Sequence, residues 1–205
     1  MRESTNGQQV ADEVYKRTGV RIDIIDGAEE ASIIASTDIS SLIQKDKDYL
    51  YIDVGGGSTE FTVFSKGKVK KSRSFPIGTV RLLDNKVSNK TWEEVEHWIK
   101  KHTKDCEHIE AIGSGGNINK IHKNSNSREG EPLSYQYLTD YLNYVSGFTY
   151  DERIRLLGFN PDRADVILYA LTVFINAMKW SGAEIVHVPR IGLADGIVRS
   201  IYNEE

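Results

Sequence analysis

Hydrophobic and polar residues alternate along several stretches of the chain and recur at helical spacing along others. Alternation is typical of a half-buried strand, whereas apolar residues three or four apart form one face of a helix. A compact apolar run bounded by turn residues also favours a strand. The stretches with strand character are residues 20–24, 49–54, 61–64, 69–75, 109–113 and 184–188.

A second set of segments has helical spacing. The longest of them begins after Asn160, a favourable N-cap, with Pro161 at the first helical position. Another opens with the acidic pair Glu29 and Glu30, which suits a helix N-terminus because the helix dipole favours negative charge there. The predicted helices are residues 8–17, 29–35, 92–101, 134–145, 149–156, 161–180 and 192–202, with a short helical stretch ending at residue 121.

A charged connector at residues 44–48 separates the opening of the chain from its main body. We therefore predict two parts, residues 1–48 and residues 49–205. In the second part, Lys66 and Gly67 have the character of a hairpin turn, so its first three strands are predicted to be antiparallel.

A glycine turn with an acid on each side follows the strand at residues 49–54. Its three glycines let backbone N–H groups approach an anion without side-chain interference. Asp53 lies near the end of one strand and Glu60 begins the next, so the two acids flank a hairpin tip. The alternative is a tight hairpin with two solvated acids. The predicted phosphate-binding residues are Gly55, Gly56, Gly57, Ser58 and Thr59.

Other glycine motifs do not fit this turn. A dinucleotide-binding fold or a P-loop requires a helix after the glycines, and no lysine follows the triplet here. Two carboxylates beside a bound phosphate would repel it unless a cation lies between them. We therefore expect Mg²⁺ as the cofactor, held by Asp53 and Glu60.

A second glycine cluster follows the strand at residues 109–113 and precedes a short helix. This is the geometry that binds an anion or a nucleotide at a helix N-terminus. The alternative is a turn that is required only for packing. We expect the two turns to face one cleft. The predicted binding residues of the second turn are Gly113, Ser114, Gly115 and Gly116.

Composition narrows the classes of partner. The chain has 205 residues, of which 39% are hydrophobic and 27% charged, as in an ordinary folded protein. Its formal net charge of −4 gives no overall attraction for polyanions, so we expect no nucleic acid partner. The longest apolar run, residues 166–178, is too short to span a membrane, and because residues 1–6 lack an apolar core we expect no signal peptide. With the single cysteine Cys106, these features predict a cytoplasmic protein without a membrane partner.

The sequence resembles the exopolyphosphatase and guanosine pentaphosphate phosphohydrolase family, within the superfamily of actin-like, sugar-kinase and heat-shock-chaperone ATPases. The matching segments run in the family order across nearly the whole chain. They are residues 1–7, 25–31, 53–60, 75–82, 113–117, 163–167 and 190–196.

The resemblance implies a fold and a division of roles. The fold is a ribonuclease-H-like α/β lobe with a mixed five-stranded sheet flanked by helices. The residue like Glu30 is the base that activates the attacking water, and those like Asp53 and Glu60 place magnesium and the water. Without the resemblance, Glu30 is better explained as an acid at a helix start.

The expected reaction is magnesium-assisted hydrolysis of the terminal phosphoanhydride bond of inorganic polyphosphate or of guanosine pentaphosphate. Two alternatives remain open: a noncatalytic sensor that binds an alarmone or polyphosphate and signals by lobe movement, and a nucleotide-binding kinase or ATPase lobe. The sequence is also compatible with a homodimer. The family's first lobe opens with its own phosphate turn, which this sequence lacks. We therefore expect the fragment to fold but to be weakly active or inactive.

Several basic residues are further candidates. Arg81 and Arg163 lie in family-like segments and could each bind phosphate through two donors, or form structural ion pairs. Lys66, Lys68 and Lys70 alternate, so they are predicted to share a strand face that either guides polyphosphate or is simply solvated. The five histidines lack metal-ligand spacing, and the three tryptophans fall on helical patterns, so they are given no role in metal or base binding.

Overall fold

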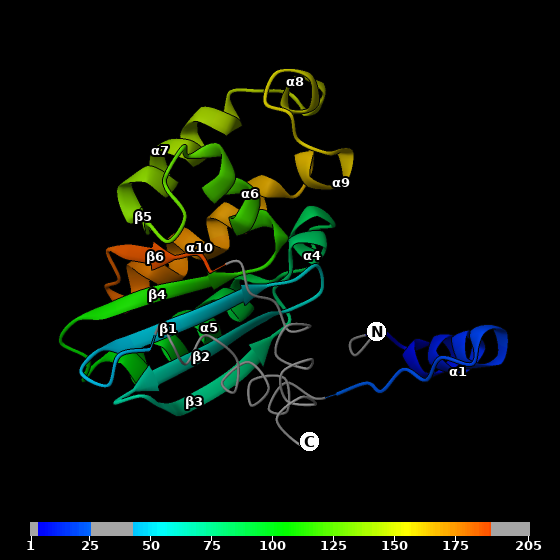
Figure 1. Ribbon diagram of the computed structural model, residues 1–205, viewed down its shortest axis with the longest axis horizontal. Coiled ribbons are helices and arrows are strands. Elements are labelled where there is room, and N and C mark those ends of the chain that lie inside the picture. The colour runs from blue at the N-terminus through cyan, green and yellow to red at the C-terminus, as the bar shows by residue number, and fades with distance from the viewer. Residues whose placement is uncertain (1–3, 26–42, 190–205) are drawn as a thin grey trace.

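A six-stranded mixed sheet forms the centre of the structure, a computed structural model in which residues 4–25 and 43–189 are described (Figure 1). The strands are β1 Asp48–Val54, β2 Thr59–Ser65, β3 Lys68–Phe75, β4 Ile109–Ser114, β5 Leu133–Ser134 and β6 Ile185–His187. Across the sheet they follow the order β3-β2-β1-β4-β6-β5. The predicted α/β class with a mixed sheet is therefore confirmed.

The sheet has six strands and not the predicted five. The additional strand, β5, contains two residues and pairs antiparallel with β6. A strand this short has no visible alternation, because a period of two needs several residues to show itself. Ser134 was predicted as the start of a helix, and it is also the N-cap of the helix that follows.

The strand register brings the polar positions of three strands together. β1 pairs antiparallel with β2 and parallel with β4, and β2 pairs antiparallel with β3. The prediction of three consecutive antiparallel strands is thus confirmed. Asp53 lies opposite Glu60 on β2 and beside Ser114 on β4. Since β1 and β4 are parallel, their carboxyl ends, and hence the two glycine turns, lie at the same edge of the sheet.

A β-bulge interrupts the lysine row of β3. The register of the β2–β3 pair shifts between Val63 and Phe64, which leaves Lys70 as an extra residue on β3. Lys66 lies in the turn before the strand, with φ of 52°. The strict alternation on which a shared face for Lys66, Lys68 and Lys70 depends is therefore broken.

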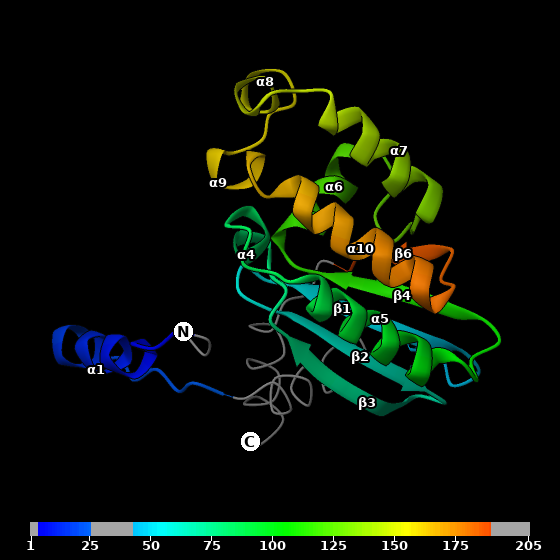
Figure 2. The ribbon, with the colours of Figure 1, turned by 180° about the vertical axis from the view of Figure 1, so that it is seen from behind.

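The helices lie mainly behind and above the sheet in the view of Figure 1. Figure 2 shows α5 and α10 against the same face of the sheet. Ser88 and Ser134 cap α5 and α7 through their hydroxyl oxygens, and Thr149 forms a capping box with Glu152 at α8. The helices are α1 Gly7–Thr18, α4 Thr79–Leu83, α5 Asn89–Thr103, α6 Gly116–Asn124, α7 Tyr135–Ser146, α8 Tyr150–Arg155, α9 Pro161–Ala164 and α10 Ile167–Ser181.

The helix predicted at residues 161–180 is divided into α9 and α10. Pro161 does occupy the first turn of α9, but the Asn160 side chain makes no capping hydrogen bond. α10 begins only after Asp165 and Val166. A continuous apolar pattern does not reveal such a break, because both helices contribute to the same core.

The two faces of the sheet are packed differently. On the face toward α5 and α10, side chains such as Leu50 and Ile52 join a large core that includes the buried residues of both helices. On the opposite face, Tyr49 and Tyr51 belong to a small second cluster with Phe64 and Ile112. Side chains alternate along a strand, so Asp53 lies on this second face, beyond the two tyrosines.

The opening of the chain forms α1, whose C-cap is Gly19 with φ of 73°. The helix prediction at residues 8–17 is confirmed, but the strand predicted at residues 20–24 is not formed. The predicted helices at residues 29–35 and 192–202 lie outside the described residues, and the boundary at residues 48/49 stays a prediction. Along the described parts of the chain, no helix is long and apolar enough to cross a membrane.

Candidate functional site

The first glycine turn joins β1 to β2 and is held from one side by α4. The Gly55 carbonyl accepts a hydrogen bond from Thr79 N at 2.9 Å. The Gly56 carbonyl accepts one from Val80 N at 3.0 Å. Within the turn, Gly55 N donates to the Ser58 carbonyl at 3.0 Å. The N-terminal amides of a five-residue helix are thus committed to the carbonyls of this turn.

These bonds fix the direction of the turn's own amides. No described peptide bond is cis, and in a planar trans peptide the N–H points opposite to the C=O. Because the carbonyls of Gly55 and Gly56 point toward α4, the N–H groups of Gly56 and Gly57 point away from it. The Gly57 carbonyl accepts from Arg81 Nε at 2.7 Å, so the N–H of Ser58 is directed in the same way. Successive amides that point in one direction are the arrangement that can bind an anion.

Gly78 is the residue that allows α4 to approach the turn so closely. A Cβ atom at this position would lie 2.2 Å from the Gly56 carbonyl oxygen and 2.5 Å from the Gly57 carbonyl carbon. Both atoms belong to the backbone, which cannot move without deforming the turn. Only glycine therefore fits here.

Two of the predicted phosphate-binding side chains make bonds to the protein backbone. Arg81 Nε is used on the Gly57 carbonyl, so this part of the guanidinium supports the turn. Thr59 is fully buried, and its hydroxyl donates to the Ile77 carbonyl. The structure therefore places both residues behind the surface formed by the glycine amides.

The two acids lie side by side next to this turn. Asp53 and Glu60 are direct cross-strand partners, so their side chains project from the same face of the sheet. Glu60 is only 8% exposed, and its Oε1 accepts hydrogen bonds from the Ser58 and Ser74 hydroxyls, each at 2.8 Å. The Tyr51 hydroxyl lies 3.5 Å from Asp53 Oδ2. Sequence reasoning did not identify Ser74, because its position opposite Glu60 depends on the β2–β3 register.

The second glycine turn lies beside Asp53. Gly115, with φ of 106°, is the N-cap of α6, where no side chain makes a capping hydrogen bond. A Cβ on Gly115 would lie 3.1 Å from the Val54 carbonyl oxygen and 3.4 Å from Asp53 Oδ1. The close approach confirms that the two turns adjoin. Gly113 and Ser114, by contrast, are buried within β4.

Arg163 covers the first residue of α6. A Cβ on Gly116 would lie 2.3 Å from Arg163 Nη1 and 2.7 Å from its Cζ, so the guanidinium rests directly on the glycine. The positive group and the N-terminus of α6 thus occupy the same place, and both favour an anion there. The sequence alone indicates Arg163 only as a general anion candidate.

The acids are suited to Mg²⁺ in kind and number. Magnesium is commonly held by one or two carboxylates, with water and substrate phosphate oxygens as the other ligands. Asp53 and Glu60 supply two carboxylates beside the amide-lined turn. In residues 4–25 and 43–189, no group of three or more His, Cys, Asp or Glu residues could hold a metal ion. Glu30, the predicted base, lies outside these residues.

The aromatic and histidine side chains have structural contacts. Trp98 packs against Phe75 with ring centroids 5.9 Å apart, and Trp92 against Trp180 at 6.0 Å. The His122 ring bonds to the Glu131 carbonyl. The three tryptophans thus pack against other aromatic rings.

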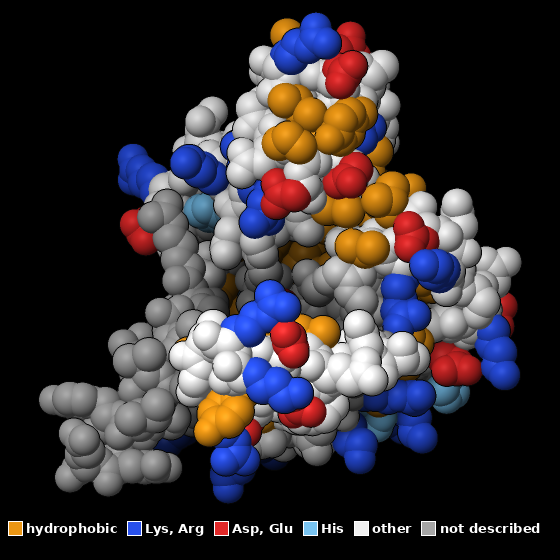
Figure 3. Space-filling model, turned by 90° about the vertical axis from the view of Figure 1, so that its right-hand side faces the viewer, with side chains coloured by type: hydrophobic (Ala, Val, Ile, Leu, Met, Phe, Trp, Pro, Cys, Tyr) orange, Lys and Arg blue, Asp and Glu red, His pale blue; other side chains and the backbone are white. Residues whose placement is uncertain are grey.

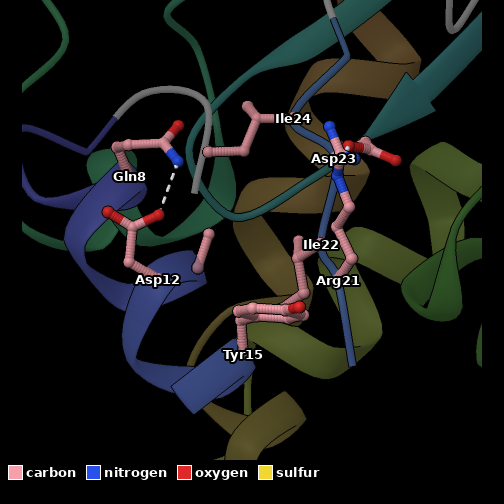
Figure 4. A pocket seen from close by; sticks show the side chains of 8 residues that line it. Gln8, Asp12, Tyr15, Arg21, Ile22, Asp23 and Ile24 are labelled. Carbon is pink, nitrogen blue, oxygen red and sulfur yellow. Dashed lines mark hydrogen bonds and ion pairs between the residues drawn. The ribbon is translucent and has the colours of Figure 1, made fainter. Parts of the chain in front are cut away.

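A cavity of about 500 Å³ lies elsewhere, between α1 and the segment that follows it (Figure 4). It contains none of the glycine-turn residues, and its ion pair Arg21–Asp23 is largely exposed. Figure 3 shows basic and acidic side chains interspersed on the side of the molecule that it presents. The lining residues of the cavity are Gln8, Ala11, Asp12, Tyr15, Arg21, Ile22, Asp23 and Ile24.

Known proteins share both sequence and fold with this chain. A bifunctional 3-dehydroquinate synthase/phosphatase of Fusobacterium nucleatum is 28% identical over 210 residues, which cover 91% of this chain and 31% of that protein. The chain thus spans about a third of the length of this curated relative.

Solved structures of similar fold include a Ppx/GppA family member from Aquifex aeolicus, with a TM-score of 0.73 and 20% identity, covering 99% of this chain and 71% of that chain. An exopolyphosphatase from Cytophaga hutchinsonii has a TM-score of 0.81 and 21% identity, with 99% and 72% covered. The family resemblance inferred from seven segments of the sequence is confirmed by a match to the Ppx/GppA phosphatase family over residues 1–205. This chain therefore belongs to the Ppx/GppA phosphatase family.

Proposed function

We propose that the full-length protein hydrolyses the terminal phosphoanhydride bond of inorganic polyphosphate or of guanosine pentaphosphate by attack of water. The observation that carries the proposal is the set of amides of the first glycine turn, directed away from α4 and adjoining the Asp53–Glu60 pair. Membership of the phosphatase family supports it. The chain covers only part of its relatives, so the activity of the whole protein is part of the proposal.

The first turn binds the terminal phosphate. The N–H groups of Gly56, Gly57 and Ser58 donate to its oxygens, and α4 keeps them in place through the opposite side of the same peptides. The Arg163 guanidinium and the N-terminus of α6 hold the next phosphates of the chain or the nucleotide, because both carry positive charge beside the second glycine turn.

Asp53 and Glu60 provide the carboxylates for a magnesium ion. When bound, the ion neutralises charge on the phosphate oxygens and supports the developing charge of the leaving group. The two carboxylates hold their positions because they lie opposite each other on paired strands, and Glu60 is fixed further by hydroxyl hydrogen bonds.

The role of the base falls to Glu30, as the family resemblance implies. Its carboxylate accepts a proton from water while the water oxygen forms a bond to the terminal phosphorus. The bond from that phosphorus to the bridging oxygen breaks, and the shortened phosphate chain leaves with the electron pair. Such a reaction needs positioning and charge neutralisation more than covalent chemistry by the protein.

A phosphate-release assay on the full-length protein tests this function. Both substrates are supplied with Mg²⁺ and with a chelator, and Glu30→Ala is assayed beside the wild type. We expect release only with Mg²⁺ and only with Glu30 present. Tight binding of either substrate without release would contradict hydrolysis and favour a sensor. Transfer of phosphate from ATP to another acceptor would favour a kinase.

A further inference from the structure

The Glu60 carboxylate is held at one oxygen by two serines from different strands. Ser58 Oγ, just before β2, and Ser74 Oγ, on β3, both lie 2.8 Å from Glu60 Oε1. An ionised carboxylate only accepts hydrogen bonds, so each hydroxyl must donate its hydrogen to it. With Oε1 fixed from two sides, the direction of Oε2 is fixed as well.

The two serines differ in their distance from the proposed phosphate site. Ser58 belongs to the glycine turn, whose amides are directed away from α4, and its hydroxyl is therefore close to any phosphate held there. Ser74 lies on the edge strand, as the direct cross-strand partner of Glu60. A hydroxyl has one hydrogen, so Ser58 cannot donate to a phosphate oxygen and to Glu60 at the same time.

We propose that Ser74 is a positioning residue that keeps the Glu60 carboxylate in place when the Ser58 hydroxyl turns to the bound phosphate. In the substrate-free protein, both serines donate to Oε1. In the complex, the Ser58 hydrogen moves to a phosphate oxygen, and the Ser74 hydroxyl continues to hold Glu60 in the orientation that its metal-binding role requires. The inference rests on the proposed function, since it assigns a task within the same site.

This arrangement predicts which kinetic parameters change when the Ser74 hydroxyl is removed. Without the Ser74 hydroxyl, the free protein still has Ser58 to hold Glu60, so substrate binding is little affected. Once the substrate is bound, Glu60 Oε1 has lost the hydrogen bonds of both serine hydroxyls, and the carboxylate is held less firmly when the reaction occurs. The defect therefore falls on kcat and on the Mg²⁺ requirement, with little change in KM.

The same strand offers a matched control. Ser72 precedes Ser74 by two residues and projects from the same face, where its hydroxyl lies 2.8 Å from Thr62 Oγ1. Both serines are half-buried. Substitution of Ser72 thus removes one hydroxyl from β3, together with its contact to Thr62 on β2, without touching Glu60.

The experiment compares Ser74→Val with Ser74→Thr in the full-length protein. Valine and threonine have nearly the same shape and both suit a strand, so the pair isolates the hydroxyl. We expect Ser74→Val to lower kcat by about ten- to a hundredfold, because a hydrogen bond to a charged group is lost. The Mg²⁺ concentration for half-maximal rate should rise, KM should stay within about twofold, and Ser74→Thr should restore most of kcat. Ser72→Val should behave as the wild type.

Several results would overturn the proposal. Equal kcat values for Ser74→Val and Ser74→Thr, or a loss confined to KM, would show that the hydroxyl does not position Glu60 during the reaction. Unfolding of both Ser74→Val and Ser74→Ala, with Ser72→Val folded, would assign the hydroxyl to stability alone. A wild-type protein that releases no phosphate with Mg²⁺ would instead remove the proposed function, and the role of Ser74 with it.

Discussion

The two glycine turns end neighbouring parallel strands at one edge of the sheet, yet they are built in different ways. The turn after β1 is held by backbone hydrogen bonds from α4 and flanked by two acids. The turn after β4 leads directly into α6, and a side chain, Arg163, lies over its glycine. One turn is thus defined by backbone atoms and the other by a side-chain guanidinium.

This difference separates the tasks of the turns. Backbone amides held by other backbone atoms keep a fixed geometry, which suits the phosphate that reacts. An arginine side chain can follow a longer or more variable ligand, which suits the phosphates or the nucleotide beyond the reacting group. Substitutions that act on one turn should therefore affect catalysis, and those that act on the other should affect substrate affinity.

The largest effect on activity is expected from substitution of the two acids beside the first turn. Asp53→Asn and Glu60→Gln keep the shape of each side chain and remove its charge. We expect each to lower the rate of phosphate release by about a thousandfold, because charge stabilisation by a bound metal contributes several kcal/mol. The rate is measured in the full-length protein at saturating substrate and Mg²⁺. Glu94→Gln, at an exposed acid on α5, serves as the control, and an equal loss there would show that the effect is not local to the site.

Gly78→Ala should disrupt the first turn through its backbone. The new Cβ would meet the Gly56 carbonyl at 2.2 Å, so α4 and the turn must separate. We expect the free energy of unfolding to fall by about 1–3 kcal/mol, as in other overpacked sites, together with most of the activity. Urea denaturation measures the first effect. Gly147→Ala is the control, because a Cβ there would lie 3.4 Å from the Tyr144 carbonyl oxygen, an ordinary contact.

Gly116→Ala should act on the second turn through a side chain. The new Cβ would displace the Arg163 guanidinium, the flexible end of a long side chain, so stability should change by less than about 1 kcal/mol. Substrate KM should rise about tenfold, as expected for the loss of a charged hydrogen-bonding contact, with kcat little changed. Arg163→Gln should give the same pattern. A fall in kcat alone would contradict the assignment of Arg163 to binding.

The smallest effect is expected at Glu110, near the start of β4, and it concerns stability in acid. Burial alone would raise the pKa of Glu110, but hydrogen bonds from Lys47 and His187 hold it below its ordinary value. A lowered folded-state pKa contributes stability above the unfolded-state pKa, and this contribution is lost as the pH falls through the folded-state value. We expect less than about 1 kcal/mol, lost below about pH 4.3, where an unperturbed glutamate titrates.

Thermal unfolding of the wild type and of Glu110→Gln at several pH values measures this contribution. The variant should lack the wild type's additional loss of stability in acid. Phosphate release at neutral pH should remain unchanged, because Glu110 lies at the start of the strand and the second turn at its end. Identical acid profiles of the two proteins would show that the Glu110 carboxylate does not contribute to stability.

Much of this site could be predicted from the sequence, because the spacing of the glycines and the acids indicates the turn directly. A triplet of glycines between strands, with Asp53 and Glu60 at its ends, predicts a hairpin, and pairing follows from the turn. Contacts between residues that lie far apart in the sequence could not be predicted in this way. Ser74 reaches Glu60 only through the bulged register of β3, which no local pattern reveals. α4 has five residues, too few for a helical period, and so its support of the turn was not foreseen. The bond from Arg81 to Gly57 follows from α4 and was missed for the same reason.

The central claim is that Asp53 and Glu60 hold Mg²⁺ beside a phosphate bound to the first glycine turn. Calorimetric titration of Mg²⁺ into the full-length protein with imidodiphosphate, a hydrolysis-resistant phosphate analogue, tests it directly. We expect Mg²⁺ to bind to the wild-type complex, and Asp53→Asn and Glu60→Gln each to weaken this binding by at least about tenfold, the cost of losing one charged ligand. Unchanged Mg²⁺ affinity in both variants would contradict the claim.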